Sequence, residues 1–173
     1  HNGRRRQRQM CIRDSSYEAF SMADKCGIIL DQELKQFDIP YNVHHEPNSI
    51  NVANFLNKGI FIDVKVVDSE CAVHRLEHEE LGEIRGKLSN NFPSGSKVKL
   101  LLQPEDLIHD DQSKLKLEVV DRKFRGTNFI YTLKTKKGEH LPVFVHSHHI
   151  HQHEKSEQFG VKSPIYIDHL VCF

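Results

Sequence analysis

Five histidines in eight positions make residues 146–153, HSHHIHQH, the densest group of metal-ligand side chains in the chain. In an extended strand, residues two apart share a face at about 6.5 to 7 Å, so a His-x-His pair can bind one ion through imidazole nitrogens. On this spacing His149, His151 and His153 would share one face. His146 and His148 would lie on the other face. The candidate ligands for zinc or another divalent metal are His148, His149, His151 and His153.

A simpler interpretation is that the same run ends a strand and begins an exposed loop. The polar sequence EKSEQ, residues 154–158, follows it directly. Histidines in polar loops often bind metals only weakly, so the stretch would then be an ordinary part of its domain, with sensing as its one special role. Both interpretations stay open on the sequence alone.

Motifs for phosphate binding or catalysis are absent from the sequence. It contains no GxxxxGK[ST], GxGxxG, GxSxG or HExxH. The acidic pairs Glu105-Asp106 and Asp110-Asp111 lie in turn-like segments, where adjacent carboxylates are usually solvated. We predict no catalytic residue and do not expect this chain to be an enzyme.

Composition argues against a nucleic-acid binder, a disulfide-rich secreted protein and a membrane-spanning protein. The 173 residues carry 24 Lys and Arg against 24 Asp and Glu, so no net field attracts nucleic acid or anionic lipid. The four cysteines form no CxxC pair, which favours a reducing cytosol over a disulfide framework. No stretch approaches the roughly 20 apolar residues of a membrane span. We expect a soluble intracellular chain.

Short helices and a hairpin are predicted before Gly59. A capping box at Ser15–Glu18 begins a helix that runs to about Lys25. CGIIL and LDQELKQ read as a hairpin, Asp38 with Pro40 begins a second helix, and Ser49 caps a third that ends before Gly59.

After Gly59 the apolar period changes from helical to two, which predicts strands. Turn sequences such as NNFPSGS and KKGE separate them, and no helical run lies between. The pattern indicates a mainly β fold with a small closed or Greek-key barrel. The predicted units are 1–15, without structure; 16–57, a short α/β piece; and 58–173, the barrel. The predicted strands are 60–68, 97–103, 114–124, 128–135, 140–146 and 164–173.

The α/β piece resembles the end of the nucleotide-binding domain of importer-type ABC ATPases. In that family an EA…AD helix is followed by a hairpin, a Q-x-D/G-x-P turn, a Y-x-x-P segment and a VA-x-F-x-G helix. The matching positions are Glu18, Ala19, Ala23, Asp24, Gln36, Pro40, Pro47, Val52, Ala53, Phe55 and Gly59.

The β region is similar to the OB-like TOBE domain that follows in those ATPases. LLQPEDLIHD matches its R-P-E-D/H-L element, and VVDRKFRGTNFIYTL matches its V…F-x-G…Y…L motif. The resemblance covers about residues 16 to 173. It assigns a regulatory-domain motif to Pro104, Glu105, Asp106, Phe124 and Gly126.

This resemblance implies a non-catalytic, regulatory C-terminal part of an ABC transporter ATP-binding subunit. ATP and magnesium belong to the intact parent, because Walker A, Walker B and the signature lie upstream in that family. The switch histidine would fall near Asp14. Implied partners are a second ATPase subunit and a membrane permease, at the cytoplasmic face of the bacterial inner membrane. The resemblance is nearest to the ferric-iron importers, with sugar and polyamine importers behind, so it implies ferric iron as the solute.

Other functions remain as alternatives. One is a free-standing histidine-rich β-barrel that binds a metal or small ligand, with Arg125–Thr127, Phe124 and Phe129 as a ligand surface. The simpler view makes Gly126 a tight bend and puts Phe129, Tyr131 and Leu133 on an inward face. An OB-type nucleic-acid binder is disfavoured because the domain is not basic.

Residues 1–15 contrast with the rest of the chain. They are rich in arginine and lack apolar periodicity. A basic arm for RNA and a disordered tail are two interpretations. RRRQRQMCIRDS also resembles translated sequencing-adapter sequence, so we assign this segment no function.

Overall fold

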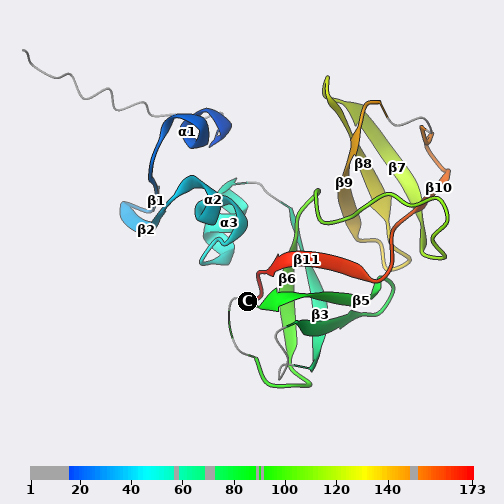
Figure 1. Cartoon of the computed structure of the whole chain (residues 1–173), viewed down its shortest axis with the longest axis horizontal. Helices are drawn as coiled ribbons and strands as arrows, with labels where there is room; N and C mark the ends of the chain where they lie inside the picture. The colour runs from blue at the N-terminus through cyan, green and yellow to red at the C-terminus, as the bar shows by residue number, and fades with distance from the viewer. Residues whose placement is uncertain (1–15, 57–58, 69–72, 89, 91, 149–151) are drawn as a thin grey trace, which may run out of the picture.

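The structure, a computed structural model, describes residues 16–56, 59–68, 73–88, 90, 92–148 and 152–173. The described chain forms a small helix-and-hairpin segment, a curled five-stranded sheet and a four-stranded sheet (Figure 1). Among these residues no helix has the length and apolar character needed to cross a membrane. The mainly β architecture after a short α/β piece agrees with the prediction from sequence.

The helix-and-hairpin segment contains two strands and three short helices. The hairpin turn places Asp31 and Gln32 at φ 52° and 64°, a backbone conformation that two-residue hairpins need and that glycine or asparagine adopts most easily. Its apolar side chains form a core of their own around Ile28, Val43, Val52 and Leu56. The elements are α1 (Ser16–Met22), β1 (Cys26–Leu30), β2 (Glu33–Asp38), α2 (Pro40–His45) and α3 (Ile50–Leu56).

Helices α2 and α3 begin where the sequence predicts them, and side chains near their first turns explain why. Pro40 occupies the first turn of α2, where its missing N–H costs no helical hydrogen bond. The Asp38 carboxylate accepts hydrogen bonds from the Ile39 N–H and the Asn42 side chain. The Ser49 hydroxyl accepts the Val52 N–H at 3.4 Å, as a cap of α3 should. The predicted cap Ser15 lies outside the described residues.

The five-stranded sheet curls into a barrel that the end of the chain closes. Its order is β11-β5-β4-β3-β6, and β11 runs parallel to β5. Beyond β11 the chain pairs with β6: the Leu101 N–H donates to the Val171 carbonyl at 2.9 Å, and Lys99 and Phe173 exchange two backbone bonds. The strands are β3 (Ile60–Asp68), β4 (His74–His78), β5 (Gly82–Leu88), β6 (Lys97–Leu102) and β11 (Ile165–Leu170).

The four-stranded sheet is an antiparallel meander with one short added strand, in the order β10-β7-β8-β9. It shares one apolar core with the barrel, so the two sheets pack as a single β region. Tyr131 and Phe159 are among the largest fully buried side chains. The strands are β7 (Lys116–Phe124), β8 (Asn128–Lys134), β9 (His140–His146) and β10 (Gln158–Gly160).

The six predicted strands are confirmed, with small differences at their ends. Three further strands, β4, β5 and β10, have no counterpart in the prediction. In β4 and β5 charged residues occupy most outward positions, and the inward position 78 is a histidine, buried at 4% exposure. That histidine interrupts the apolar alternation from which strands are predicted. The boundary at 57/58 stays a prediction.

Candidate functional site at the joint between the helical segment and the barrel

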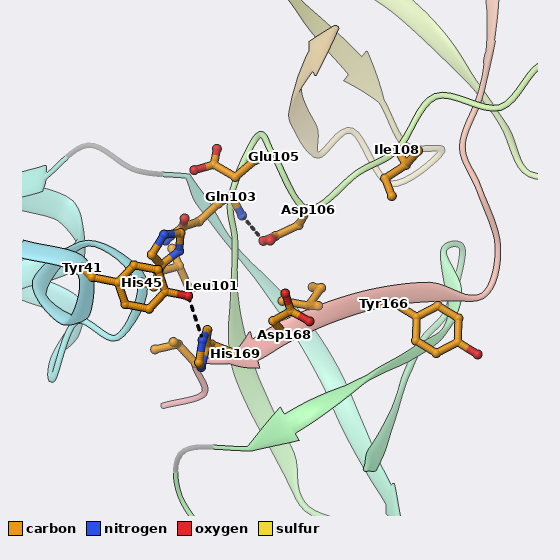
Figure 2. A pocket seen from close by; sticks show the side chains of 12 residues that line it. Tyr41, His45, Leu101, Gln103, Glu105, Asp106, Ile108, Tyr166, Asp168 and His169 are labelled. Atoms are coloured by element: carbon orange, nitrogen blue, oxygen red, sulfur yellow. Dashed lines mark hydrogen bonds between the residues drawn. The ribbon is translucent and has the colours of Figure 1, made fainter. Parts of the chain in front are cut away.

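A pocket of about 290 Å³ lies where α2 meets the barrel (Figure 2). The helix supplies two aromatic rings, the turn after β6 supplies two carboxylates, and β11 supplies a third carboxylate and an imidazole. The lining residues are Tyr41, His45, Leu101, Gln103, Glu105, Asp106, Ile108, Tyr166, Ile167, Asp168, His169 and Val171.

The predicted motif Pro104-Glu105-Asp106 forms the turn on one side of this pocket. The Asp106 carboxylate accepts the Gln103 N–H at 2.7 Å, and the Asp106 N–H donates to the Gln103 carbonyl at 3.1 Å. This reciprocal pair closes the turn just after β6, and Leu107 enters the core directly behind it. The motif therefore has a structural role that proline and aspartate suit.

Burial, together with the nearby carboxylates of Glu105 and Asp168, raises the pKa of Asp106 to about 7. The hydrogen bond from the Gln103 N–H lowers the pKa and offsets part of this effect. Asp106 is thus a carboxyl group that titrates near neutral pH in a pocket rich in acidic side chains. Such a group responds to the charge of whatever enters the pocket.

His169 connects the two parts of the molecule across the pocket. Its Nδ1 lies 2.9 Å from a carboxylate oxygen of Glu46. Its Nε2 lies 3.3 Å from the Tyr41 hydroxyl (Figure 2). A neutral ring with its proton on Nδ1 satisfies both contacts, donating to Glu46 and accepting from Tyr41. A register shift in β11 between Ile167 and His169 makes room for this placement.

Close packing fixes the joint beside the pocket. Ala53 of α3 packs with Leu101 and Val171 in a small apolar cluster of its own. The Gln103 side chain donates to the His44 carbonyl at 3.2 Å. At Gly59 an added Cβ would lie 2.1 Å from the Leu102 carbonyl oxygen, so only glycine permits this close approach of the two backbone segments. The arrangement holds the helical segment in a defined position on the barrel.

The other half of the predicted motif lines a second cavity, about 560 Å³ in volume. Gly126 has φ +80° in the bend between β7 and β8, and the Phe124 and Phe129 rings lie 5.1 Å apart. Phe129 is partly buried against the core, while Tyr131 and Leu133 are fully buried. Residues of the histidine run join this cavity. Its lining is Phe124, Gly126, Thr127, Phe129, Ser147, His148 and Gln152.

The histidine run is not one continuous strand over its described part. Strand β9 ends at His146, and a turn follows at residues 147–148. His148 is exposed, whereas His149 and His151 lie outside the described residues. His153 is buried, and its Nε2 lies 2.8 Å from that of His109. The metal site predicted for the histidine run therefore stays a prediction.

Sequence reasoning missed His109 and treated Asp111 as a loop acid. With His153 they form a group whose ligand atoms lie within 4.8 Å of one another. The signal in the sequence was the H-x-D spacing of residues 109–111, which a search confined to the histidine run overlooks.

Comparisons with known proteins relate this chain to transporter subunits. No protein-family model matches it. It is 23% identical over 156 residues, 87% of its length, to the spermidine/putrescine import ATP-binding protein PotA of Mycoplasmopsis synoviae. The corresponding protein of Hahella chejuensis is 21% identical over 157 residues. That of Oleidesulfovibrio alaskensis is 30% identical over 98 residues, 52% of this chain.

Similarity to import ATP-binding proteins extends over most of the chain. This supports the predicted relation to ATP-binding subunits of ABC importers. The chain spans 31% of the Mycoplasmopsis relative and 42% of the Hahella relative, well under half of either protein. Both names describe import of spermidine and putrescine, so the comparisons give no support to ferric iron.

Proposed function

We propose that this chain is the regulatory part of an ABC importer's ATP-binding subunit and that the imported solute is a polyamine. The observation that carries the proposal is the similarity over 87% of the chain to proteins named for spermidine and putrescine import. Because these relatives are named for spermidine and putrescine import, we propose a polyamine in place of the ferric iron expected from the sequence.

The fold supports the regulatory assignment. A mainly β region with a closed barrel follows the helical segment, in the order that the resemblance to ABC ATPases implies. The joint between them contains Asp106, whose pKa of about 7 makes it sensitive to charge, and His169, which contacts both parts. In this proposal the joint transmits the state of the barrel to the ATP-binding part of the parent protein.

The parent protein supplies the catalysis in this proposal. It would bind ATP and magnesium through upstream residues, pair with a second ATPase subunit, and contact a membrane permease from the cytoplasmic side. This chain contributes regulation without catalytic residues. Nucleic acid is not among its proposed partners.

Two chimaeric proteins test the proposal. In one, residues 16–173 replace the matching segment of a spermidine/putrescine import ATP-binding protein; in the other, they replace that of a ferric-iron importer. Each is expressed in a bacterium that lacks the corresponding subunit, and uptake of labelled putrescine or iron is measured. We expect the first chimaera to restore uptake and the second to fail.

Two controls make the result interpretable. Replacing the phosphate-binding lysine of the parent segment must abolish uptake, which shows that transport depends on ATP hydrolysis. Purified chimaeras are also assayed for ATPase activity and for binding to the permease. A folded, permease-bound polyamine chimaera without uptake, or a working iron chimaera alone, would contradict the proposal.

A further inference from the structure

The ligand atoms of three side chains come together beside the buried ring of Phe159. The Nε2 atoms of His109 and His153 are 2.8 Å apart. One carboxylate oxygen of Asp111 lies 3.0 Å from the His109 Nε2 and 3.4 Å from the His153 Nε2. Two imidazoles thus approach each other edge to edge, with a carboxylate beside both.

These separations fit the coordination sphere of a small transition-metal ion. Bonds of about 2.0 to 2.1 Å in a tetrahedral site place neighbouring ligand atoms roughly 3.3 Å apart. The observed distances of 2.8, 3.0 and 3.4 Å need only a few tenths of an ångström of adjustment. Two nitrogens and one oxygen suit zinc, cobalt, nickel or ferrous iron better than magnesium or calcium, which prefer oxygen.

The two imidazoles are held rigidly in place. Their side chains are 6% and 5% exposed, and both rings pack against the buried Phe159. The backbone N–H of His153 donates a hydrogen bond to the Tyr131 hydroxyl at 3.3 Å. Locked rings of this kind lower the cost of assembling a metal site. The Asp111 side chain is 40% exposed, so it is the ligand that can adjust its position.

Backbone pairing sets the position of the loop that carries His109 and Asp111. The Asp110 N–H donates to the Gly160 carbonyl and the Lys162 N–H to the Ile108 carbonyl, each at 2.9 Å. A Cβ at Gly160 would lie 2.0 Å from the Asp110 carbonyl oxygen. The glycine therefore permits a contact that brings residues distant in sequence to one site.

Neighbouring charges support this arrangement. A Glu157 carboxylate oxygen lies 3.8 Å from the His153 Nδ1, on the ring edge away from His109, where it favours the tautomer with Nε2 available as a ligand. Two cations lie nearby, but they bind other groups. Arg122 contacts the His153 carbonyl and Glu154, and Lys116 donates to the Asp111 carbonyl.

We propose that His109, Asp111 and His153 bind one divalent transition-metal ion of the zinc class, with water at the remaining position. The site goes beyond the proposed transport function and does not depend on it. The bound ion would join the loop after β6 to the segment before β10, and so link the barrel to the four-stranded sheet.

Calorimetric titration of the whole chain with zinc chloride tests the proposal. We expect one equivalent to bind with a Kd of about 10 μM or below. His109→Ala and Asp111→Asn should each weaken binding by at least about 30-fold, since removing a ligand costs more than removing an outer partner. Asp111 is partly exposed, so the second variant tests the site even where the first fails to fold, as circular dichroism will show.

Two further variants separate this site from others. His140→Ala removes an exposed histidine at the start of β9 and should leave the affinity unchanged. The triple change H148A/H149A/H151A removes the other predicted ligands of the histidine run and should also leave it unchanged. Millimolar zinc binding, affinity lost only in the triple variant, or full affinity in Asp111→Asn would overturn the proposal.

Discussion

Among the residues that the structure describes, histidine rings meet in different ways at the joint and in the cluster of His109 and His153. At the joint, His44 and His45 stack with ring centres 4.5 Å apart and an interplanar angle of 29°. In the second cluster, His109 and His153 meet at 70° with their Nε2 atoms 2.8 Å apart. Stacked rings present faces to each other, whereas rings that meet at their nitrogens can share an ion. Histidine content alone does not reveal which arrangement a chain adopts.

The largest expected effect comes from Gly160→Ala, which acts on the second cluster. The new Cβ would meet the Asp110 carbonyl oxygen, so the two backbones must separate. We expect a loss of about 3 kcal/mol in the free energy of unfolding, measured by urea denaturation, together with a loss of zinc binding. Gly138→Ala is the control: its φ is +88° but its Cβ meets open space, so about 1 kcal/mol should be lost and zinc affinity kept.

Gly59→Ala is the counterpart at the joint. Its Cβ would lie 2.1 Å from the Leu102 carbonyl oxygen, so a loss of stability similar to that of Gly160→Ala is expected. Zinc affinity should not change, because the clash lies at the joint and involves none of the three ligands. Equal loss of zinc binding in both glycine variants would show that the two clusters are not independent.

Asp106→Asn tests the joint through the pH dependence of the free energy of unfolding. Because the folded pKa is about 7 and the unfolded value is near 4, the folded state binds the extra proton between these values. The contribution of Asp106 to the stability of the natural chain therefore falls as pH rises from about 4 to about 7. We expect the variant to lack this decline and to gain roughly 2 kcal/mol relative to the natural chain between pH 5 and pH 8.

Exposed carboxylates do not obscure this measurement. Lysine contacts lower the pKa of Asp63 and of Glu79, so their contribution to stability is lost only as pH falls below the ordinary carboxyl range. That effect is common to both proteins and cancels in their difference. Parallel pH profiles for Asp106→Asn and the natural chain would mean that Asp106 is ionised throughout the range.

Among the variants at the joint and in the second cluster, His169→Ala should give the smallest effect. It removes the contacts to Glu46 and Tyr41, but all three groups are partly exposed and water replaces the lost partners. We expect a decrease of about 0.5 to 1 kcal/mol in unfolding free energy, without any change in zinc affinity. His140→Ala should change stability by less than about 0.5 kcal/mol. A loss above about 2 kcal/mol would give His169 a larger structural role than this comparison assigns.

Sequence reasoning recovered the parts of the fold that depend on local pattern. Alternation in residues 60–68 and 128–135 predicted strands correctly, and Pro40 and Ser49 marked two helix starts. It missed β4 because His78 occupies an inward position that pattern analysis counts as polar. It also could not foresee that residues 171–173 close the barrel on β6, since that pairing links segments far apart in the chain.

The candidate sites likewise divide into features that local sequence predicts and features that depend on contacts between distant segments. The motif Pro104–Asp106 was found from its resemblance and lies in a turn beside the first pocket. The H-x-D spacing marks His109 and Asp111 as possible ligands, but not their meeting with His153. His109 is 44 residues away from His153, and the approach of Gly160 to Asp110 brings the two together. The raised pKa of Asp106 likewise depends on burial, which adjacent acids in a sequence do not disclose.

Cobalt(II) absorption of the whole chain tests most directly the claim that the two histidine clusters differ in kind. Cobalt occupies zinc sites and absorbs visible light according to its ligands. We predict that one equivalent gives ligand-field bands that persist in His169→Ala and vanish in His109→Ala. Bands that vanish in His169→Ala and persist in His109→Ala would contradict the account.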